Sequence, residues 1–442
     1  MKNNARNTVF YEVAKSYVKA SLELIISRSQ NGEQVPYEIV EEYDFEKTDT
    51  RMRFGTDYRA KPLYSQLVSR HKDEIHGLPE CQMCKRIMKS DPVMSKHIDT
   101  PLLFYNTSSS YPTETYLDYL LMRQLESTAE KPEFSLDRFD EAYRNLEVFF
   151  QSDKLIMRTV APIHNFQCDA NLVDLGDGLC IRRIERTEQE QLLHEFKWSP
   201  SMSLDEILDL KYVIENSYEA EKVFNYSPTL KPEPVFRSGH GEINKLLIAL
   251  RLFKSGAIGI NTRKTFCASE IPLSIGGGSS YRSSPVSFTG EKYVLASSEI
   301  QDFIGFWSKF KTVDLRRSAQ LGIALRRFSY AYERESLEDK LIDLLVAFEA
   351  LFFKKGELSE LSHRLSTRVS RLLEQEYGKR KDVFKRMKVF YKTRSKVVHG
   401  EQVELEYGFI RTVEDYLRRS VKMFLEYSHM DFDEILTHLD LD

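Results

Sequence analysis

The chain between residues 391 and 400 reads Tyr391-Lys392-Thr393-Arg394-Ser395-Lys396-Val397-Val398-His399-Gly400. Arg394 is followed by four residues and then by His399, and Gly400 is the residue type that most often ends a helix. A histidine transfers protons near neutral pH, and an arginine carries a permanent planar charge that pairs with phosphate oxygens. The stretch therefore combines a helix end with two side chains suited to chemistry on a phosphate.

Four long segments with a helical spacing of apolar residues include or adjoin this stretch. They cover residues 337–353, 357–377, 381–399 and 407–427, and further helical patterns occupy 304–310 and 315–332. Ser336 precedes the first long segment as a capping residue. Because the connections between them are short, we expect the helices to pack antiparallel. Residues 301–442 are therefore predicted to form an all-α helical bundle.

The upstream two thirds of the chain combine helices with strands. Residues 8–28, 114–127 and 136–152 have the periodicity of helices, so 1–152 is predicted to be a mostly helical region. Residues 154–166 and 171–185 are rich in β-branched residues and are broken by a turn signal at 176–178, and a helix is expected at 241–255. Residues 153–300 are therefore predicted to be a mixed α/β region. The expected fold class is α+β, with a mixed α/β N-terminal part followed by the helical bundle.

Composition restricts the class of protein. A chain of 442 residues with 41% hydrophobic and 29% charged residues is typical of a globular protein with about two to three domains. Five cysteines, an odd number, argue against a disulfide framework. The first residues lack the apolar run of a signal peptide, and the longest apolar run, 341–353, is too short to span a bilayer. We expect a cytoplasmic protein without a membrane segment.

Positive charge is concentrated in the predicted bundle. The whole chain has a net charge of −4, whereas residues 351–400 contain fourteen Lys or Arg and five Asp or Glu, a local net charge of +9. A basic stretch in an otherwise acidic chain indicates a localised face for anions. The alternative is an ordinary solvated face of exposed helices.

Three segments of the predicted bundle resemble the HEPN domains of the ApeA-like branch, a helical family named for higher-eukaryote and prokaryote nucleotide binding. These segments are 337–353, with Asp339 to Leu344 followed by Ala347-Phe348-Glu349-Ala350-Leu351; 362–373, with Ser362 to Arg368 and Leu372-Leu373; and 391–400. The resemblance covers about residues 305–428. It implies a metal-independent endoribonuclease that works as a dimer, often as a toxin or effector of antiphage and abortive-infection systems. Many family motifs carry Asn, Asp or His directly after the arginine, where this chain has Ser395.

The resemblance assigns roles that RNA chemistry can use. RNA carries its own nucleophile, the 2′-hydroxyl, so the protein must move protons and stabilise a crowded phosphorane. His399 is the candidate for proton transfer, and Arg394 is the candidate clamp on the phosphorane. The expected products are a 2′,3′-cyclic phosphate and a 5′-hydroxyl, and DNA should not be cut. The RNA is expected to be tRNA or mRNA, and residues 153–300 are expected to sense a trigger, such as a phage product, or to select the substrate.

The spacing of the two residues adds a constraint. Five residues at about 100° each place Arg394 and His399 roughly 140° apart on an ideal helix. One straight helix therefore does not present both side chains easily to one point. The family's solution is a cleft in which two copies of this helix pool their Arg-His pairs, so we predict a homodimer with a composite site and an isologous interface.

Several neighbouring residues are candidates for supporting roles. Glu349 lies on an otherwise apolar face and needs a partner, so it could orient Arg394 or Arg368, or form a purely structural ion pair. Lys392 and Lys396 could bind RNA phosphates or be merely solvated, and any direct role of Ser395 is uncertain. His399 could be only a cap that favours the negative end of the helix dipole. A second function class follows from these alternatives: an inactive HEPN module that binds RNA or nucleotides and dimerises.

A metal site has one weak candidate in the sequence. Cys81 and Cys84 form a single C-x2-C pair, and a set of four zinc ligands would need histidines from the same region: His71, His76 and His97. The chain has no second cysteine pair, and these spacings match no common zinc finger. Incidental reduced thiols are the alternative, and no cofactor is expected.

Overall fold

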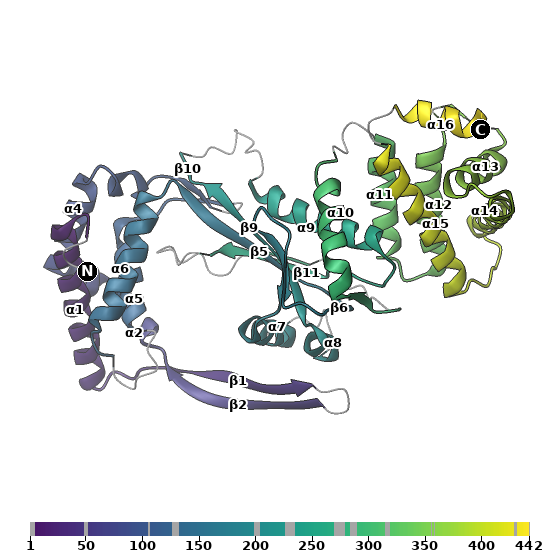
Figure 1. The fold of residues 1–442 in the computed structure, drawn as a ribbon. Coiled ribbons are helices and arrows are strands. Elements are labelled where there is room, and N and C mark those ends of the chain that lie inside the picture. The colour runs from purple at the N-terminus through teal and green to yellow at the C-terminus, as the bar shows by residue number, and fades with distance from the viewer. Residues whose placement is uncertain are drawn as a thin grey trace. The chain divides into compact units, whose positions relative to one another are not determined.

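The structure is a computed structural model of the chain. It describes residues 5–47, 52–104, 107–125, 132–198, 204–225, 235–268, 279–282, 290–313, 319–354, 356–357, 359–427 and 431–441. The fold is α+β, as predicted: the sheets lie in the N-terminal two thirds, and helices dominate the remainder (Figure 1). The chain divides into two compact units, the first formed by 1–159, 217–240 and 264–280, the second by 160–216, 241–263 and 281–442.

These borders differ from the three consecutive regions predicted from the sequence. The helices of 301–442 belong to the same unit as 160–216 and 241–263, so the predicted border at 300/301 is not a border of a compact unit. The borders of the two units fall inside four strands, β5 (Lys154–Pro162), β9 (Tyr212–Glu221), β11 (Thr262–Cys267) and β12 (Ser279–Arg282), and inside the helix α9 (Val235–Phe253). Strand pairing between distant segments, which periodicity does not reveal, accounts for this difference.

The first unit is built around packed helices. They are α1 (Thr8–Gln30), α2 (Tyr64–Arg70), α3 (Lys72–Gly77), α4 (Pro79–Ser90), α5 (Thr113–Leu125) and α6 (Leu136–Gln151), with the 3-10 turn η2 (Met94–His97). The side chains of Asn7 and Ser135 cap α1 and α6 by accepting hydrogen bonds from backbone N–H groups. The helices predicted at 8–28, 114–127 and 136–152 are α1, α5 and α6, and their apolar faces meet in one core.

The first unit also contains a long hairpin that the sequence did not predict. Strands β1 (Tyr37–Lys47) and β2 (Met52–Pro62) pair antiparallel, from Tyr37 opposite Pro62 to Lys47 opposite Met52. A small three-stranded sheet consists of β10 (Val223–Phe224), β3 (Leu102–Phe104) and β4 (Thr107–Ser109). The many charged residues of segment 37–62 hid the strand pattern.

A six-stranded sheet has the order β12-β11-β5-β9-β8-β7, in which β7 is Leu172–Asp174, β8 is Leu179–Arg183 and β12 is Ser279–Arg282. β7 and β8 pair antiparallel around residues 176–178, all of which have positive φ, so the predicted turn is confirmed. β13 (Tyr293–Leu295) pairs parallel with β6 (Phe166–Cys168). The helices of this part are α7 (Arg186–Trp198), α8 (Leu204–Asp209) and α9 (Val235–Phe253).

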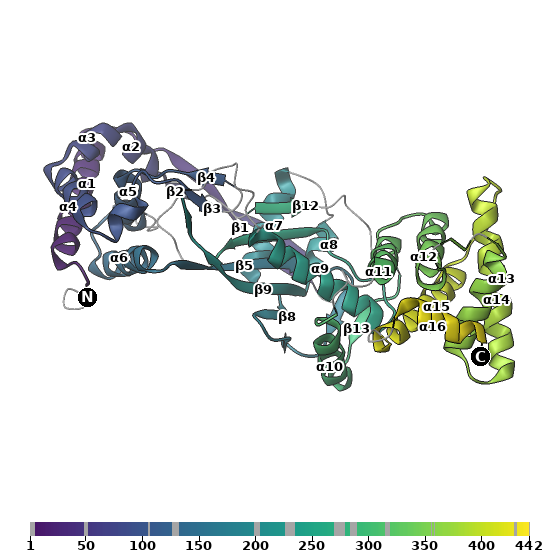
Figure 2. The same ribbon diagram turned by 90° about the horizontal axis from the view of Figure 1, so that it is seen from above.

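The C-terminal part of the second unit is a helical bundle. Its helices are α10 (Ile300–Phe310, preceded by the 3-10 turn η3, Ser297–Glu299), α11 (Ala319–Ala331), α12 (Leu337–Phe352), α13 (Leu361–Leu373), α14 (Tyr377–Val398), α15 (Tyr407–Glu426) and α16 (Phe432–Leu441). Ser336 caps α12 by accepting from the N–H of Asp339 at 3.0 Å. Both ribbon views place α13 and α14 on the side of the bundle away from α11 (Figure 2). The helical part of the sequence prediction is confirmed, with 315–318 outside the described residues.

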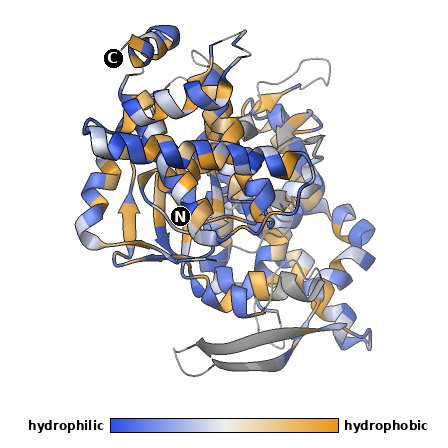
Figure 3. Ribbon diagram, turned by 90° about the vertical axis from the view of Figure 1, so that its right-hand side faces the viewer, coloured by the Kyte–Doolittle hydropathy of each residue, from blue (hydrophilic) through white to orange (hydrophobic). Residues whose placement is uncertain are grey.

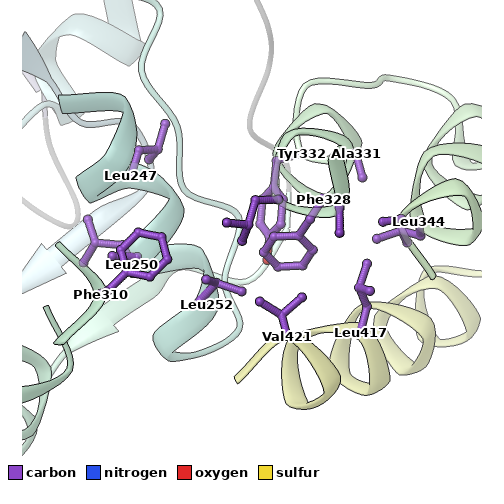
Figure 4. Packing of buried hydrophobic residues seen from close by; sticks show 14 of the residues in the cluster. Leu247, Leu250, Leu252, Phe310, Phe328, Ala331, Tyr332, Leu344, Leu417 and Val421 are labelled. Atoms are coloured by element: carbon purple, nitrogen blue, oxygen red, sulfur yellow. The ribbon is translucent and has the colours of Figure 1, made fainter. Parts of the chain in front are cut away.

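Within the second unit, α9 shares its core with the bundle. Leu247, Leu250 and Leu252 of α9 belong to the same buried cluster as Phe328 of α11 and Val421 of α15 (Figure 4). Arg251 of α9 is fully buried, and its guanidinium donates to the carbonyl oxygens of Ile258 and Ser329. No helix in the described part of the chain is both long and apolar enough to cross a membrane.

Candidate active site

Helix α14 carries both motif residues, and its two sides differ in character. Val383, Met387 and Phe390 are buried against the bundle. Arg394 lies within about 40° of these three positions on a helix with about 100° per residue, so it belongs to the inward side. His399 lies roughly 140° away from Arg394, on the solvent side. The helix thus points the two candidate residues in different directions.

Glu349 of α12 pairs with Arg394. The guanidinium Nη2 lies 3.7 Å from the carboxylate Oε2, and about a quarter of each side chain is exposed, 23% and 24% respectively. Two arginines were expected as possible partners of Glu349, and the structure pairs it with Arg394. The Nε of Arg394 is buried and has no hydrogen-bond partner among the described residues. The contact is an ion pair rather than a hydrogen bond, since 3.7 Å is too long for one.

Tyr391 completes this cluster, and the sequence analysis did not identify it. Burial raises the pKa of the Tyr391 hydroxyl, and the charge of Glu349 raises it further, whereas Arg394 lowers it. Tyr391 precedes Arg394 by one helical turn, and residues three apart in a helix are neighbours on its surface. That spacing was the signal that could have identified Tyr391.

His399 forms the end of α14 and is exposed. The N–H of Gly400 donates to the carbonyl of Val397, and the N–H of Glu401 donates to that of Lys396, both at 3.0 Å. This pattern is a Schellman motif, which needs positive φ at the residue after the cap, and Gly400 has φ of 78°. Gly400 therefore stops the helix directly after His399. Within the described residues the imidazole has neither a hydrogen bond nor an ion pair.

Arg368 has partners other than the one expected. Its side chain is fully buried and pairs with carboxylates other than Glu349, so the structure places it in a supporting position. The guanidinium binds the carboxylates of Glu357 and Asp440 through four contacts of 2.7 Å, and it also donates to the carbonyl of Phe352. These bonds connect α13 to α16 and to the segment after α12, so Arg368 stabilises the bundle.

The other motif neighbours lie on the outer side of α14. Lys392 and Lys396 are exposed, and Lys396 lies 3.4 Å from a carboxylate oxygen of Glu401. Ser395 is partly exposed, and its carbonyl accepts from the N–H of His399 at 3.1 Å. This bond belongs to the helix backbone, and it assigns no chemical role to the Ser395 hydroxyl.

The weak zinc candidates do not form a ligand set. Cys81 and Cys84 are buried in the core of the first unit, and burial raises their pKa to about 11 and about 12, which disfavours the thiolates that bind zinc. The three histidines have other partners: His71 contacts Glu33 and Glu74, His76 contacts Asp118, and His97 contacts the carbonyl of Val93. No group of three or more potential metal ligands occurs among the residues that the structure describes.

Comparison of the chain with models of protein families, with curated proteins and with solved structures found no match.

Proposed function

We propose that this chain is a metal-independent endoribonuclease of the HEPN type. The observation that carries the proposal is the end of α14, where an exposed histidine without a partner in the described residues follows, by five positions, an arginine that a carboxylate holds in place. The helices α12, α13 and α14 support the proposal, since they occupy the three segments in which the sequence resembles that family.

The proposed reaction needs only RNA and these side chains. A neutral imidazole takes the proton of the 2′-hydroxyl, whose oxygen then bonds to phosphorus. The bond from phosphorus to the 5′-oxygen breaks, and the departing oxygen receives a proton from an imidazolium. The guanidinium of Arg394 stabilises the charge that gathers on the phosphorane oxygens. The products are a 2′,3′-cyclic phosphate and a 5′-hydroxyl.

A dimer would bring an arginine and a histidine to one phosphate, which a single straight helix does not do. Arg394 and His399 of one copy lie roughly 140° apart, so we propose that Arg394 of one copy and His399 of the other act on the same phosphate. Two copies related by a two-fold axis provide this arrangement twice. The Glu349–Arg394 pair then serves to aim the guanidinium.

Mixing two inactive variants tests this arrangement. Arg394→Ala and His399→Ala homodimers each lack one kind of group, whereas a mixed dimer keeps one arginine and one histidine on different chains. Random exchange makes about half of the dimers mixed. We expect the mixture to cut RNA faster than either variant alone. If subunit exchange is demonstrated and no activity returns, the composite site is wrong.

The first experiment on the function itself is cleavage of total cellular RNA in EDTA. Wild-type protein should leave cyclic phosphate ends, His399→Ala should lose the activity, and single-stranded DNA should remain intact. His438→Ala is the matched control, because His438 is an exposed histidine of α16 outside the candidate site. Equal cleavage by wild type and His399→Ala would eliminate the proposed role of His399.

A binding module is the second candidate function. One observation favours it: the Arg394 guanidinium is turned toward Glu349, and three quarters of the side chain is covered. In that case Arg394 is a structural partner, and α14 binds RNA or a nucleotide without cutting it. Retained RNA binding with no cleavage, in both wild type and His399→Ala and with added phage extract, would favour this function.

The cellular role that we propose is that of a cytoplasmic antiphage effector held inactive until a trigger arrives, with tRNA or mRNA as its target. It rests on the family resemblance. Expression of wild-type protein in a bacterial host during phage infection should stop growth, and His399→Ala should abolish this effect while the protein accumulates normally. Growth arrest by both proteins would contradict a nuclease toxin.

A further inference from the structure

Five lysines form one row along α14. Lys381, Lys385, Lys388, Lys392 and Lys396 follow one another at intervals of four, three, four and four residues. At about 100° per residue they fall within an arc of about 80° and extend over about 22 Å. His399 follows Lys396 by three residues and lies in the same arc. We call these five residues the lysine row; it ends at the candidate catalytic histidine.

The charge of the lysine row is largely uncompensated. Lys381, Lys385 and Lys392 are exposed, and within the described residues none of the three has a carboxylate within 4.0 Å. Lys388 lies near the ring of Phe384, and Lys396 has only the ion pair with Glu401. The only acidic residue of α14 is Asp382. The helices that face the viewer in Figure 3, on the side of the bundle with α13 and α14, are mainly hydrophilic (Figure 3).

A shallow pocket adjoins the row between α14 and α15. It has a volume of about 300 Å³ and is lined by Lys385, Arg386, Val389, Phe390, Phe409 and Thr412. We call it the ring pocket. Lys385 belongs to both features, so the pocket opens beside the row. The rings of Phe390 and Phe409 lie 4.9 Å apart edge to face, and Phe409 is partly exposed.

We propose that the lysine row and the ring pocket together bind single-stranded RNA. One unstacked base occupies the ring pocket against Phe409, and the following phosphates lie along Lys388, Lys392 and Lys396 toward His399. The placement of the scissile phosphate at His399 rests on the proposed nuclease function. The binding of the strand itself does not.

The pocket favours a single strand over a duplex. Aromatic rings beside a row of cations are the means by which proteins bind single strands without reading their sequence. In a duplex the base faces are stacked on one another and cannot enter a pocket, so a helix of RNA would engage the lysines alone. An anionic membrane would likewise meet the lysines and leave Phe409 without a role.

The experiment is a binding titration that does not depend on cleavage. The probe is a fluorescein-labelled 12-nucleotide 2′-O-methyl oligouridine, which has no 2′-hydroxyl to react, and anisotropy is measured over a range of salt concentrations. One phosphate contact at each of the five lysines of the row predicts a slope of log K against log salt of about −3.5 for a single strand. In the variant Lys388→Gln/Lys392→Gln the slope should fall to about −2.1.

Matched variants separate the effect of the lysine row from that of net charge, and the effect of the Phe409 ring from that of a lost fold. Lys309→Gln/Lys379→Gln removes two exposed lysines outside the row and should keep the wild-type slope. Phe409→Leu should weaken binding about 5- to 150-fold, because it removes a stacking surface, while Phe409→Tyr should bind normally. Melting curves of all variants exclude loss of the fold as the cause.

The outcomes distinguish this inference from the proposed function. Equal slopes for the two double variants, no effect of Phe409→Leu, or tighter binding of a 12-base-pair duplex would overturn it. Row-dependent binding to phosphatidylserine vesicles without binding of the oligonucleotide would overturn it in favour of a membrane face. If the oligonucleotide binds as predicted but RNA is not cut in EDTA, the inference stands and the nuclease proposal fails. If the lysine-row variant and Phe409→Leu both cut RNA as fast as wild type, the inference is wrong and the nuclease proposal stands.

Discussion

Replacing Arg368 by Met tests whether this arginine stabilises the bundle. Met has a similar volume and is apolar, so the change removes the charge and leaves the space filled. In the protein the guanidinium binds Glu357 and Asp440, and only 14% of the Glu357 side chain is exposed. The variant leaves Asp440 without this cation and leaves Glu357 with Arg364 alone, and breaking a largely buried pair by removing one partner is costly.

Two arguments give the magnitude. Removing one member of a buried ion pair typically costs about 3–5 kcal/mol. Independently, the pKa of Glu357 is lowered from 4.5 to about 2, first by the hydrogen bonds of Arg368 and further by the N–H of Lys354 and the charges of Arg368 and Arg364. The whole shift corresponds to about 3.4 kcal/mol of linkage at pH 7, which is the upper limit for the share of Arg368. Because Asp440 is 39% exposed and Arg368 supplies only part of the shift, the smaller figure applies, and we expect the free energy of unfolding of the second unit to fall by about 2–3 kcal/mol.

The sign of the pH dependence follows from the lowered pKa of Glu357. The stabilisation is complete above pH 4.5, the usual pKa, and is lost as the pH falls toward the folded-state pKa of about 2. By pH 3 about 2 kcal/mol of it should be gone. The difference between wild type and Arg368→Met should therefore narrow between pH 7 and pH 3, by at most about that amount, because Lys354 and Arg364 also lower this pKa.

Urea unfolding followed by tryptophan fluorescence is the assay. Both tryptophans, Trp198 and Trp307, belong to the second unit, and Trp307 is buried, so the signal reports on that unit. Arg364→Met is the matched control: Arg364 contacts the same Glu357 at 3.2 Å but is 38% exposed, so its loss should cost less than about 1 kcal/mol. Equal losses for the two variants, or a loss below about 1 kcal/mol for Arg368→Met, would refute the reasoning.

Three further predictions follow from the structure. Gly400→Ala should destabilise the second unit by about 1–2 kcal/mol in the same urea assay, because φ of 78° is costly for a side chain although nothing lies within 4 Å of the added Cβ; Gly400→Asn should cost less. Burial lowers the pKa of His97 to about 4, so the free energy of unfolding of the first unit should fall by up to about 3 kcal/mol as the pH falls from 6.5 toward 4. Hydrogen exchange of the α6 peptide should become faster over this range in wild type and not in His97→Gln. Arg418→Met removes the donor to the Arg251 carbonyl and the Tyr332 hydroxyl, and it should lower the urea midpoint of the second unit more than Arg411→Met, whose partner Glu291 is exposed.

The helices of this chain could be predicted because their signals are local. Ser135 and Ser336 cap the helices that follow them, and apolar residues at intervals of three and four mark the buried faces. The turn at 176–178 was recognised for the same reason, since it joins two adjacent strands. The hairpin of β1 and β2 was missed because charged residues break its alternating pattern. The order of the six-stranded sheet was beyond prediction, because β5 pairs with strands more than fifty residues away.

In the candidate site, too, the local features could be predicted from the sequence, and the contacts between distant segments could not. Arg394, His399 and the glycine that stops the helix are visible within seven residues of sequence. The partner of Glu349 was one of two expected arginines, and only packing of α12 on α14 decides between them. The partners of Arg368 could not be predicted, because one of them, Asp440, lies 72 residues further along the chain. Ionic contacts between distant segments leave no periodic trace in a sequence.

Hydrogen bonds connect the bundle to the α/β part of the second unit, and a contact between two aromatic rings continues this connection to α14. The last carbonyls of a helix need donors from outside it, and at the end of α9 these donors come from α15. Arg418 donates to the carbonyl of Arg251, and Lys422 donates to that of Phe253, both at 2.8 Å. α15 in turn packs against α14 through the rings of Phe409 and Phe390. A displacement of α9 would therefore break hydrogen bonds to α15, the helix that forms one wall of the ring pocket, so residues 241–253 are linked to the proposed RNA site without contacting it.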